Sequence, residues 1–173
     1  EFAKRAGIAV YARASFSEGR ETVIRSNAPE ESAGVSAVVS ERKVALVRFM
    51  GRAVTDRFLG ILEAAEATYT PIKELRFQCP DEQVSWARGS FVVSTSPLPD
   101  WPRTRDALRE AGGSELEVLE ELGAVSLIGV GINRDTRNVT RATRIMRELE
   151  APVIALATSG FRISFITPGT HLD

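Results

Sequence analysis

The clearest pattern of apolar and polar positions lies in the last third of the chain. Residues 124–132 are apolar at nearly every position and contain Gly129 and Gly131, which predicts a buried strand that runs into a tight loop. Apolar residues then recur at helical spacing until Pro152 ends the helix. They are Val139, Ala142, Ile145, Met146 and Leu149. Residues 153–165 follow as two strands joined by a hairpin turn, so a sheet with helices on one face is expected.

A longer cycle of the same kind precedes it. The predicted elements are, in order, a strand at 44–51, a helix at 53–68, strands at 71–77 and 84–93, a helix at 101–111 and a strand at 116–119. Asp100 and Pro102 are typical of a helix start, and Gly89 allows a bulge in its strand. The order is βαββαβ, which is that of a ferredoxin-like unit.

The last third of the chain supplies only βαββ, so its unit lacks a helix and a strand. We expect the opening residues to supply both, with a helix at 2–6 and a strand at 8–13. The predicted fold class is therefore α+β, with two ferredoxin-like βαββαβ units, the first inserted in the second. The expected boundaries are 1–25 for the opening part, 26–40 for an exposed linker, 41–122 for the first unit and 123–173 for the second.

Composition narrows the classes of partner. The 173 residues carry a formal net charge of −1, with 43% hydrophobic and 26% charged residues. This balance gives no reason to expect a nucleic-acid or membrane partner, and no apolar run is long enough to span a bilayer. A single cysteine, Cys79, favours a reducing, cytoplasmic setting. The chain starts without a methionine, and we expect it to be a piece of a larger protein.

Two stretches carry a resemblance to a known family. They are AKRAGIAVYARASFSEGRETVI near the start, and VSLIGVGI with ATSGFRISFITP near the end. The first resembles the helix, strand and loop that close the catalytic part of aspartate kinases. The second resembles the second ACT domain of that family, in which the first ACT domain is inserted. The resemblance covers the whole chain in outline and is vague between residues 41 and 113.

This resemblance implies a regulatory region with tandem ACT domains, which bind an end-product amino acid such as lysine or threonine and form a homodimer. The parent aspartate kinase would phosphorylate L-aspartate with ATP and Mg²⁺, in the cytoplasm, at the head of lysine, threonine and methionine biosynthesis. The family's Lys-Phe-Gly-Gly segment for ATP does not occur in this chain. We therefore expect the chain to be catalytically inert, with no catalytic or metal-binding residues and no cofactor of its own, and to contact its own catalytic domain.

The resemblance places the amino-acid effector at the turn between the first strand and the helix of a unit, where backbone N–H groups can bind a carboxylate. Asp135 would face the ammonium group of the effector. The candidate residues are Gly131, Ile132, Asn133, Arg134, Asp135, Thr136, Asn138, Val139, Thr158 and Ser159. The first unit offers a weaker candidate set, consisting of Met50, Gly51, Arg52 and Asp56.

Both turns depart from the Asp-x-Pro-Gly sequence of the family. The first reads MGRAVT and the second NRDTRN, in which Asn138 can adopt the left-handed conformation of a glycine. An alternative is therefore a degenerate ACT module that binds no ligand and serves only in dimer assembly. Simpler roles are also open: Asp135 can be a helix cap, Thr158 can satisfy an edge backbone, and the two glycines of GVG are more typical of a strand-end turn than of a nucleotide cradle.

The remaining chemistry-bearing residues are isolated or lie on one helix. Five arginines share a helix face that is either solvated or bound to a phosphate or an acidic partner. They are Arg134, Arg137, Arg141, Arg144 and Arg147. His171 and Cys79 have no neighbouring residue in the sequence that would support a catalytic or metal-binding role.

Overall fold

The computed structural model describes residues 8–12, 22–24, 34–52, 54–79 and 86–172, in two compact units. The N-terminal compact part comprises residues 1–33 and contains a two-stranded antiparallel sheet of β1 (Val10–Ala12) and β2 (Thr22–Ile24). The predicted strand at 8–13 thus has its core at β1. The predicted opening helix and most of the linker lie outside the described residues.

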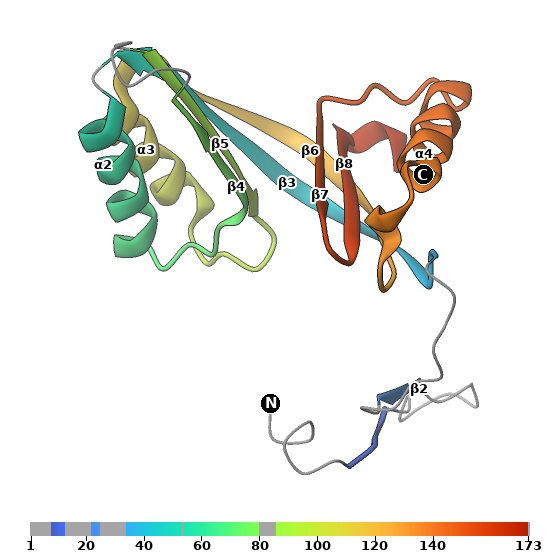
Figure 1. Cartoon of the computed structure of the whole chain (residues 1–173). Coiled ribbons are helices and arrows are strands. Elements are labelled where there is room, and N and C mark those ends of the chain that lie inside the picture. Colours follow the sequence, from blue (N-terminus) through green and yellow to red (C-terminus); the bar gives the residue numbers. More distant parts are fainter. Residues whose placement is uncertain (1–7, 13–21, 25–33, 53, 80–85, 173) are drawn as a thin grey trace. The chain divides into compact units, whose positions relative to one another are not determined.

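The larger compact part, residues 34–173, forms a six-stranded antiparallel sheet in the order β4-β5-β3-β6-β8-β7, with three α-helices among the described residues (Figure 1). The elements are β3 (Ala37–Arg52), α2 (Val54–Ala67), β4 (Lys73–Gln78), β5 (Trp86–Ser94), α3 (Trp101–Gly112), β6 (Leu116–Ile128), α4 (Thr136–Glu148), β7 (Ala155–Ser159) and β8 (Arg162–Pro168). Short 3₁₀ turns occur at η1 (Gly113–Glu115), η2 (Ile132–Arg134) and η3 (Gly169–His171). No described helix is long and apolar enough to cross a membrane.

Two strands, β3 and β6, run the whole length of the sheet. The first part of β3, at 37–42, pairs with 123–128 of β6, and the rest pairs with the beginning of β6. The predicted linker at 26–40 is therefore wrong at its end, because Ala37 already begins a strand. The predicted boundary at 122/123 also falls inside β6. The strand predicted at 116–119 continues through the polar pair Glu120-Glu121 to Ile128 as one strand.

A bulge in each long strand lies where the two parts of the sheet meet. The pairing register shifts around Lys43 of β3 and around Glu121 of β6, and both residues have a φ of 58°. Each bulge adds one residue, which moves the following side chains to the opposite face of the strand. As a result, α2, α3 and α4 all pack on the same face of the sheet. Within a long strand, the side chains on this face are odd-numbered on one side of the bulge and even-numbered on the other.

The twisted sheet can accordingly be described as two halves. The α2–α3 half contains β4, β5 and the adjoining parts of β3 and β6, and the α4 half contains β7, β8 and the paired segments 37–42 and 123–128. Figure 1 shows α2 and α3 on one outer side and α4 on the other, so that β4–β5 and β7–β8 face each other between them. The strand at 8–13, which we expected to complete the second ferredoxin-like unit, instead contains β1, which pairs with β2, and segment 37–42 pairs with 123–128.

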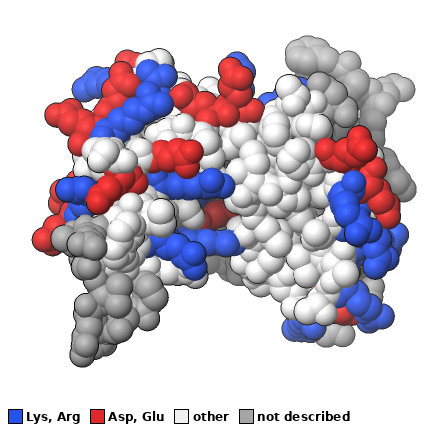
Figure 2. Space-filling view, turned by 90° about the horizontal axis from the view of Figure 1, so that it is seen from above, with Lys and Arg blue, Asp and Glu red and all other residues white. Residues whose placement is uncertain are grey.

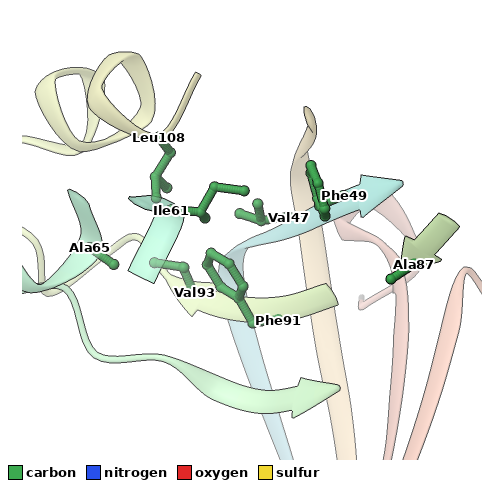
Figure 3. Close-up of a cluster of buried hydrophobic side chains, with 8 residues drawn as sticks. All are labelled: Val47, Phe49, Ile61, Ala65, Ala87, Phe91, Val93 and Leu108. Atoms are coloured by element: carbon green, nitrogen blue, oxygen red, sulfur yellow. The ribbon is translucent and has the colours of Figure 1, made fainter. Parts of the chain in front are cut away.

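Apolar clusters hold each layer. In the α2–α3 half, side chains of β3 and β5 point toward Ile61 of α2 and Leu108 of α3, which are both fully buried (Figure 3). In the α4 half, Ala142 and Met146 of α4 pack against Phe165 of β8. A third cluster lies between the two facing halves and is formed by Val44, Leu46, Val92, Leu122, Ala124 and Ile166. Burial of these side chains is the main favourable contribution to folding.

Two details of the sequence prediction need correction. Gly89 sits in a regular ladder opposite Phe49, and the ring of Phe58 lies 3.0 Å from where its Cβ would be, so glycine serves close packing there rather than a bulge. The predicted apolar face of α4 is only partly covered, because Ile145 is 45% and Leu149 68% exposed.

Candidate functional site

The loop between β6 and α4 is built around Gly131, which has a φ of 66° and precedes the turn η2. Glycine adopts this left-handed conformation at no steric cost. Ile132 is fully buried in the α4 cluster and anchors the loop. Asn138, a residue type that can adopt the left-handed conformation, lies instead in the first turn of α4, where its Nδ2 donates to the Ile132 carbonyl at 2.8 Å. The Asn138 side chain therefore holds the loop in place, and Asn138 does not act as a left-handed turn residue.

The loop contacts the β7–β8 hairpin through Asn133. Its Nδ2 donates to the carbonyl of Ser159 and, at 3.2 Å, to the carbonyl of Arg162. Thr158 and Ser159 are exposed at the end of β7. The structure thus brings the predicted loop and the hairpin together, with Asn133 as the link between them.

Asp135 is the N-cap of α4. Its Oδ1 accepts from the backbone N–H of Arg137 at 2.8 Å, and its Oδ2 accepts from Arg137 Nε at 2.5 Å. The backbone and side-chain hydrogen bonds from Arg137 lower the pKa of the Asp135 carboxyl. The backbone N–H of Asn138 in turn donates to the Asp135 carbonyl. Asp135 therefore engages two N–H groups at the start of α4, those of Arg137 and Asn138, as an N-cap does.

The rest of the loop has its own pairings. The N–H of Ile132 donates to the Gly129 carbonyl and that of Arg134 to the Gly131 carbonyl. Thr136 is exposed and Val139 is partly buried on the first turns of α4. A ligand carboxylate at this loop could use the N–H groups of Ile132 and Arg134 only by breaking these bonds.

The turn between β3 and α2, which is the corresponding turn of the predicted first ferredoxin-like unit, is covered by the carboxylate of Glu115. A Cβ on Gly51 would lie 2.3 Å from Cδ of Glu115, so the absence of a side chain makes room for that carboxylate, which pairs with Arg57 of α2. Met50 is exposed on β3, Asp56 is exposed in the first turn of α2, and Arg52 ends β3. The weaker candidate site therefore has an anionic side chain over its glycine.

A group of polar side chains joins the two facing halves of the sheet. Lys73 Nζ of β4 donates to both carboxylate oxygens of Glu41, at 3.1 and 3.0 Å, and also to Ser94. Burial raises the pKa of the Glu41 carboxyl, but the hydrogen bonds of Ser94 and Lys73 and the charges of Lys73 and Arg162 outweigh it, so the pKa lies below its usual value.

Two arginines and a pair of serines make further polar contacts. Arg48 donates to the Ile154 carbonyl at 3.1 Å, and Arg76 donates to the Leu156 carbonyl. The hydroxyls of Ser126 and Ser164, both buried, lie 3.0 Å apart. The sequence analysis identified none of these residues. Their partners lie 38 to 106 positions away, and no local spacing signals such contacts.

Figure 2 shows Lys and Arg side chains along the outer side of the α4 half, at the right, with Asp and Glu side chains beside them, and charges of both signs over the α2–α3 half. The predicted arginine face of α4 is thus a surface feature, and Arg144 and Arg147 line a shallow depression of ≈ 470 Å³ on it. His171 lies in η3 and is exposed, as is Cys79. Among the described residues no group of three or more His, Cys, Asp or Glu could hold a metal ion.

A six-stranded antiparallel sheet with its helices on the outer sides and a capped strand-to-helix loop is consistent with an ACT-like fold. No family model and no curated protein matches the sequence. Solved structures do match. The regulatory subunit of aspartate kinase from Thermus thermophilus, in its ligand-free form, has a TM-score of 0.66 at 19% identity, over 80% of this chain and 91% of that one.

Whole enzymes are similar as well. Escherichia coli aspartokinase III in complex with lysine and aspartate has a TM-score of 0.71 at 15% identity and 97% coverage of this chain, and the aspartate kinase of Clostridium acetobutylicum has 0.70 at 11% and 98%. This chain spans only 37% and 40% of their lengths. The resemblance seen in the sequence is thus confirmed at the level of the fold, since these structural neighbours are aspartate kinases and their regulatory subunits.

Proposed function

We propose that this chain is the regulatory region of an aspartate kinase. The observation that carries the proposal is the fold, which matches a free-standing regulatory subunit over most of both chains. The chain lacks the ATP-binding segment of the family, so ATP, Mg²⁺ and the phosphorylation of aspartate belong to a catalytic domain in the same cytoplasmic enzyme. The chain itself acts by shifting a conformational equilibrium.

We further propose that it consists of tandem ACT units. The order β3-α2-β4-β5-α3-β6, with strands arranged β4-β5-β3-β6, is that of a ferredoxin-like unit. The second unit would use β6, α4, β7 and β8, with the first part of β3 as its fourth strand. This division makes the first unit an insertion in the second, and the two units share β3 and β6.

The effector proposed is an amino acid such as lysine or threonine, bound between the loop that precedes α4 and the end of β7. The hydrogen bond from Asn133 to the Ser159 carbonyl supports this location, because it holds the loop against the hairpin. Calorimetric titration of the purified chain with lysine, threonine and methionine tests it. Asp135→Ala is expected to weaken binding about tenfold or more through loss of one charge-assisted pair. Unchanged affinity in Asp135→Ala, with a loss in Asp56→Ala, would place the sensor in the first unit.

The alternative is an assembly module without a ligand. The Glu115 carboxylate over Gly51 and the cap formed by Asp135 favour it, because a carboxylate of the protein already lies at each predicted turn. Dimer formation belongs to either proposal, through the edge strands β4 and β7 or the partly uncovered face of α4. Light scattering at high concentration that gives only the 18.9 kDa monomer would contradict it.

A further inference from the structure

A cavity of ≈ 390 Å³ lies between the two facing halves of the sheet, where β4 approaches the β7–β8 hairpin. Its polar walls come from Glu74 and Arg76 of β4 and from Ser159, Arg162 and Ser164 of β7 and β8. The volume is within the range of about 300–1,000 Å³ that is typical of small-molecule sites. The cavity lies on the open face of the sheet, opposite the face that carries α4.

Arg162 supplies an unused donor at this cavity. Its Nε is buried and has no hydrogen-bond partner within the described part of the chain. A guanidinium is always protonated, and a buried N–H without an acceptor is costly. The Glu41 carboxylate, on which the charge of Arg162 acts, already accepts two hydrogen bonds from Lys73. The Nε–H group of Arg162 therefore has no acceptor, and an anionic ligand would provide one.

Glu74 supplies the opposite charge. The register between β4 and β5 shifts between Lys73 and Arg76, and Glu74 has a φ of 53°, which is unusual for a residue with a side chain. A bulge of this kind redirects a side chain, and here the side chain lines the cavity. Glu74 forms no ion pair with any described residue. The cavity thus offers one uncommitted carboxylate and one uncommitted guanidinium N–H.

We propose that this cavity binds a free α-amino acid, whose carboxylate accepts from Arg162 Nε while its ammonium donates to Glu74. Phe161, beside the cavity and 64% exposed, provides an apolar wall for the ligand side chain. The proposal takes its class of ligand from the proposed function, and it names a site other than the α4 loop. A ligand held in this way ties β4 of the α2–α3 half to β8 of the α4 half. It would thereby favour the arrangement in which the two halves face each other.

The test is calorimetric titration of the purified chain with L-lysine, L-threonine, L-methionine and L-aspartate. Arg162→Gln and Glu74→Gln are each expected to weaken binding about tenfold or more, because each removes one charge-assisted hydrogen bond. Arg88→Gln is the matched control, since Arg88 bonds to Gln78 on another part of β4–β5, and it should bind as the unmodified chain does. The Nε–Hε resonance of Arg162 in a ¹⁵N spectrum should shift and saturate with the same affinity.

The outcomes separate this site from the α4 loop. Binding that survives both Arg162→Gln and Glu74→Gln but is lost in Asp135→Ala would overturn the cavity and leave the proposed function intact. Absence of binding by all four amino acids would overturn the cavity and amino-acid sensing together, and leave the assembly module. If Arg162→Gln lowers the melting temperature, Glu74→Gln decides, because Glu74 is partly exposed and forms no ion pair among the described residues.

Discussion

The buried serine pair gives a sharp test of the contact between β6 and β8. Ser126 and Ser164 are 4% and 1% exposed and lie directly opposite each other, with their hydroxyl oxygens 3.0 Å apart. One hydroxyl donates and the other accepts. Replacing either serine by alanine leaves a buried hydroxyl without its partner, which costs about 1–3 kcal/mol. Replacing both removes the unpaired group, so the double variant should be close to the original stability.

The assay is urea unfolding followed by circular dichroism, for Ser126→Ala, Ser164→Ala and the double variant. The expected coupling energy between the two sites is about 1–3 kcal/mol, with a sign that makes the double variant more stable than the sum of the single effects predicts. Ser114→Ala, at an exposed serine of η1, is the control and should change stability by less than about 0.5 kcal/mol. Single effects that simply add would refute the argument, since they would mean that the two hydroxyls do not depend on each other.

Three further predictions use the same structure. Phe91→Ala, at a side chain 2% exposed in the α2–α3 core, should cost about 3–5 kcal/mol in urea unfolding, and a cost near zero would contradict that core. Because the folded-state pKa of Glu41 lies below 4.5, its ion pair stabilises the fold above that pH and is lost as pH falls through the lowered pKa. The stability difference between Glu41→Gln and the original chain, at most about 1 kcal/mol because both partners are about a third exposed, should therefore shrink from pH 6 to pH 3, and a constant difference would count against the pair. Ile145→Glu should raise the monomer fraction in light scattering, whereas Thr143→Glu should not, if α4 contributes to a dimer.

Helix positions could be predicted from the sequence because their signals are local. Asp100 accepts from the Arg103 N–H and Asp135 from the Arg137 N–H, and both helices begin where these cap residues predicted. The apolar spacing likewise predicted helices at 53–68 and 101–111, and the structure has α2 at Val54–Ala67 and α3 at Trp101–Gly112. Such features depend on residues within one or two turns of each other.

The shared strands could not be predicted in this way. Segment 37–42 has no strong pattern of its own, and its place beside β6 depends on residues more than 80 positions away. The bulges at Lys43 and Glu121 place non-glycine residues at positive φ, which propensities do not anticipate. The candidate loop lies beside the hairpin as expected, but Asp135 accepts from the Arg137 N–H at the start of α4. The cavity at Arg162 combines residues of β4 with residues of the β7–β8 hairpin, which is far from β4 in the sequence.

The length of β3 and β6 has a consequence for how the chain unfolds. Both halves of the sheet contain parts of β3 and β6. Dividing the chain at 122/123 would therefore split β6 and leave neither half with a complete sheet. The residues 34–173 should therefore melt in one cooperative transition rather than in two domain-like steps. Hydrogen exchange of the β3 and β6 amides would then report the global free energy of unfolding, and the binding of a small molecule in either half would be felt in both.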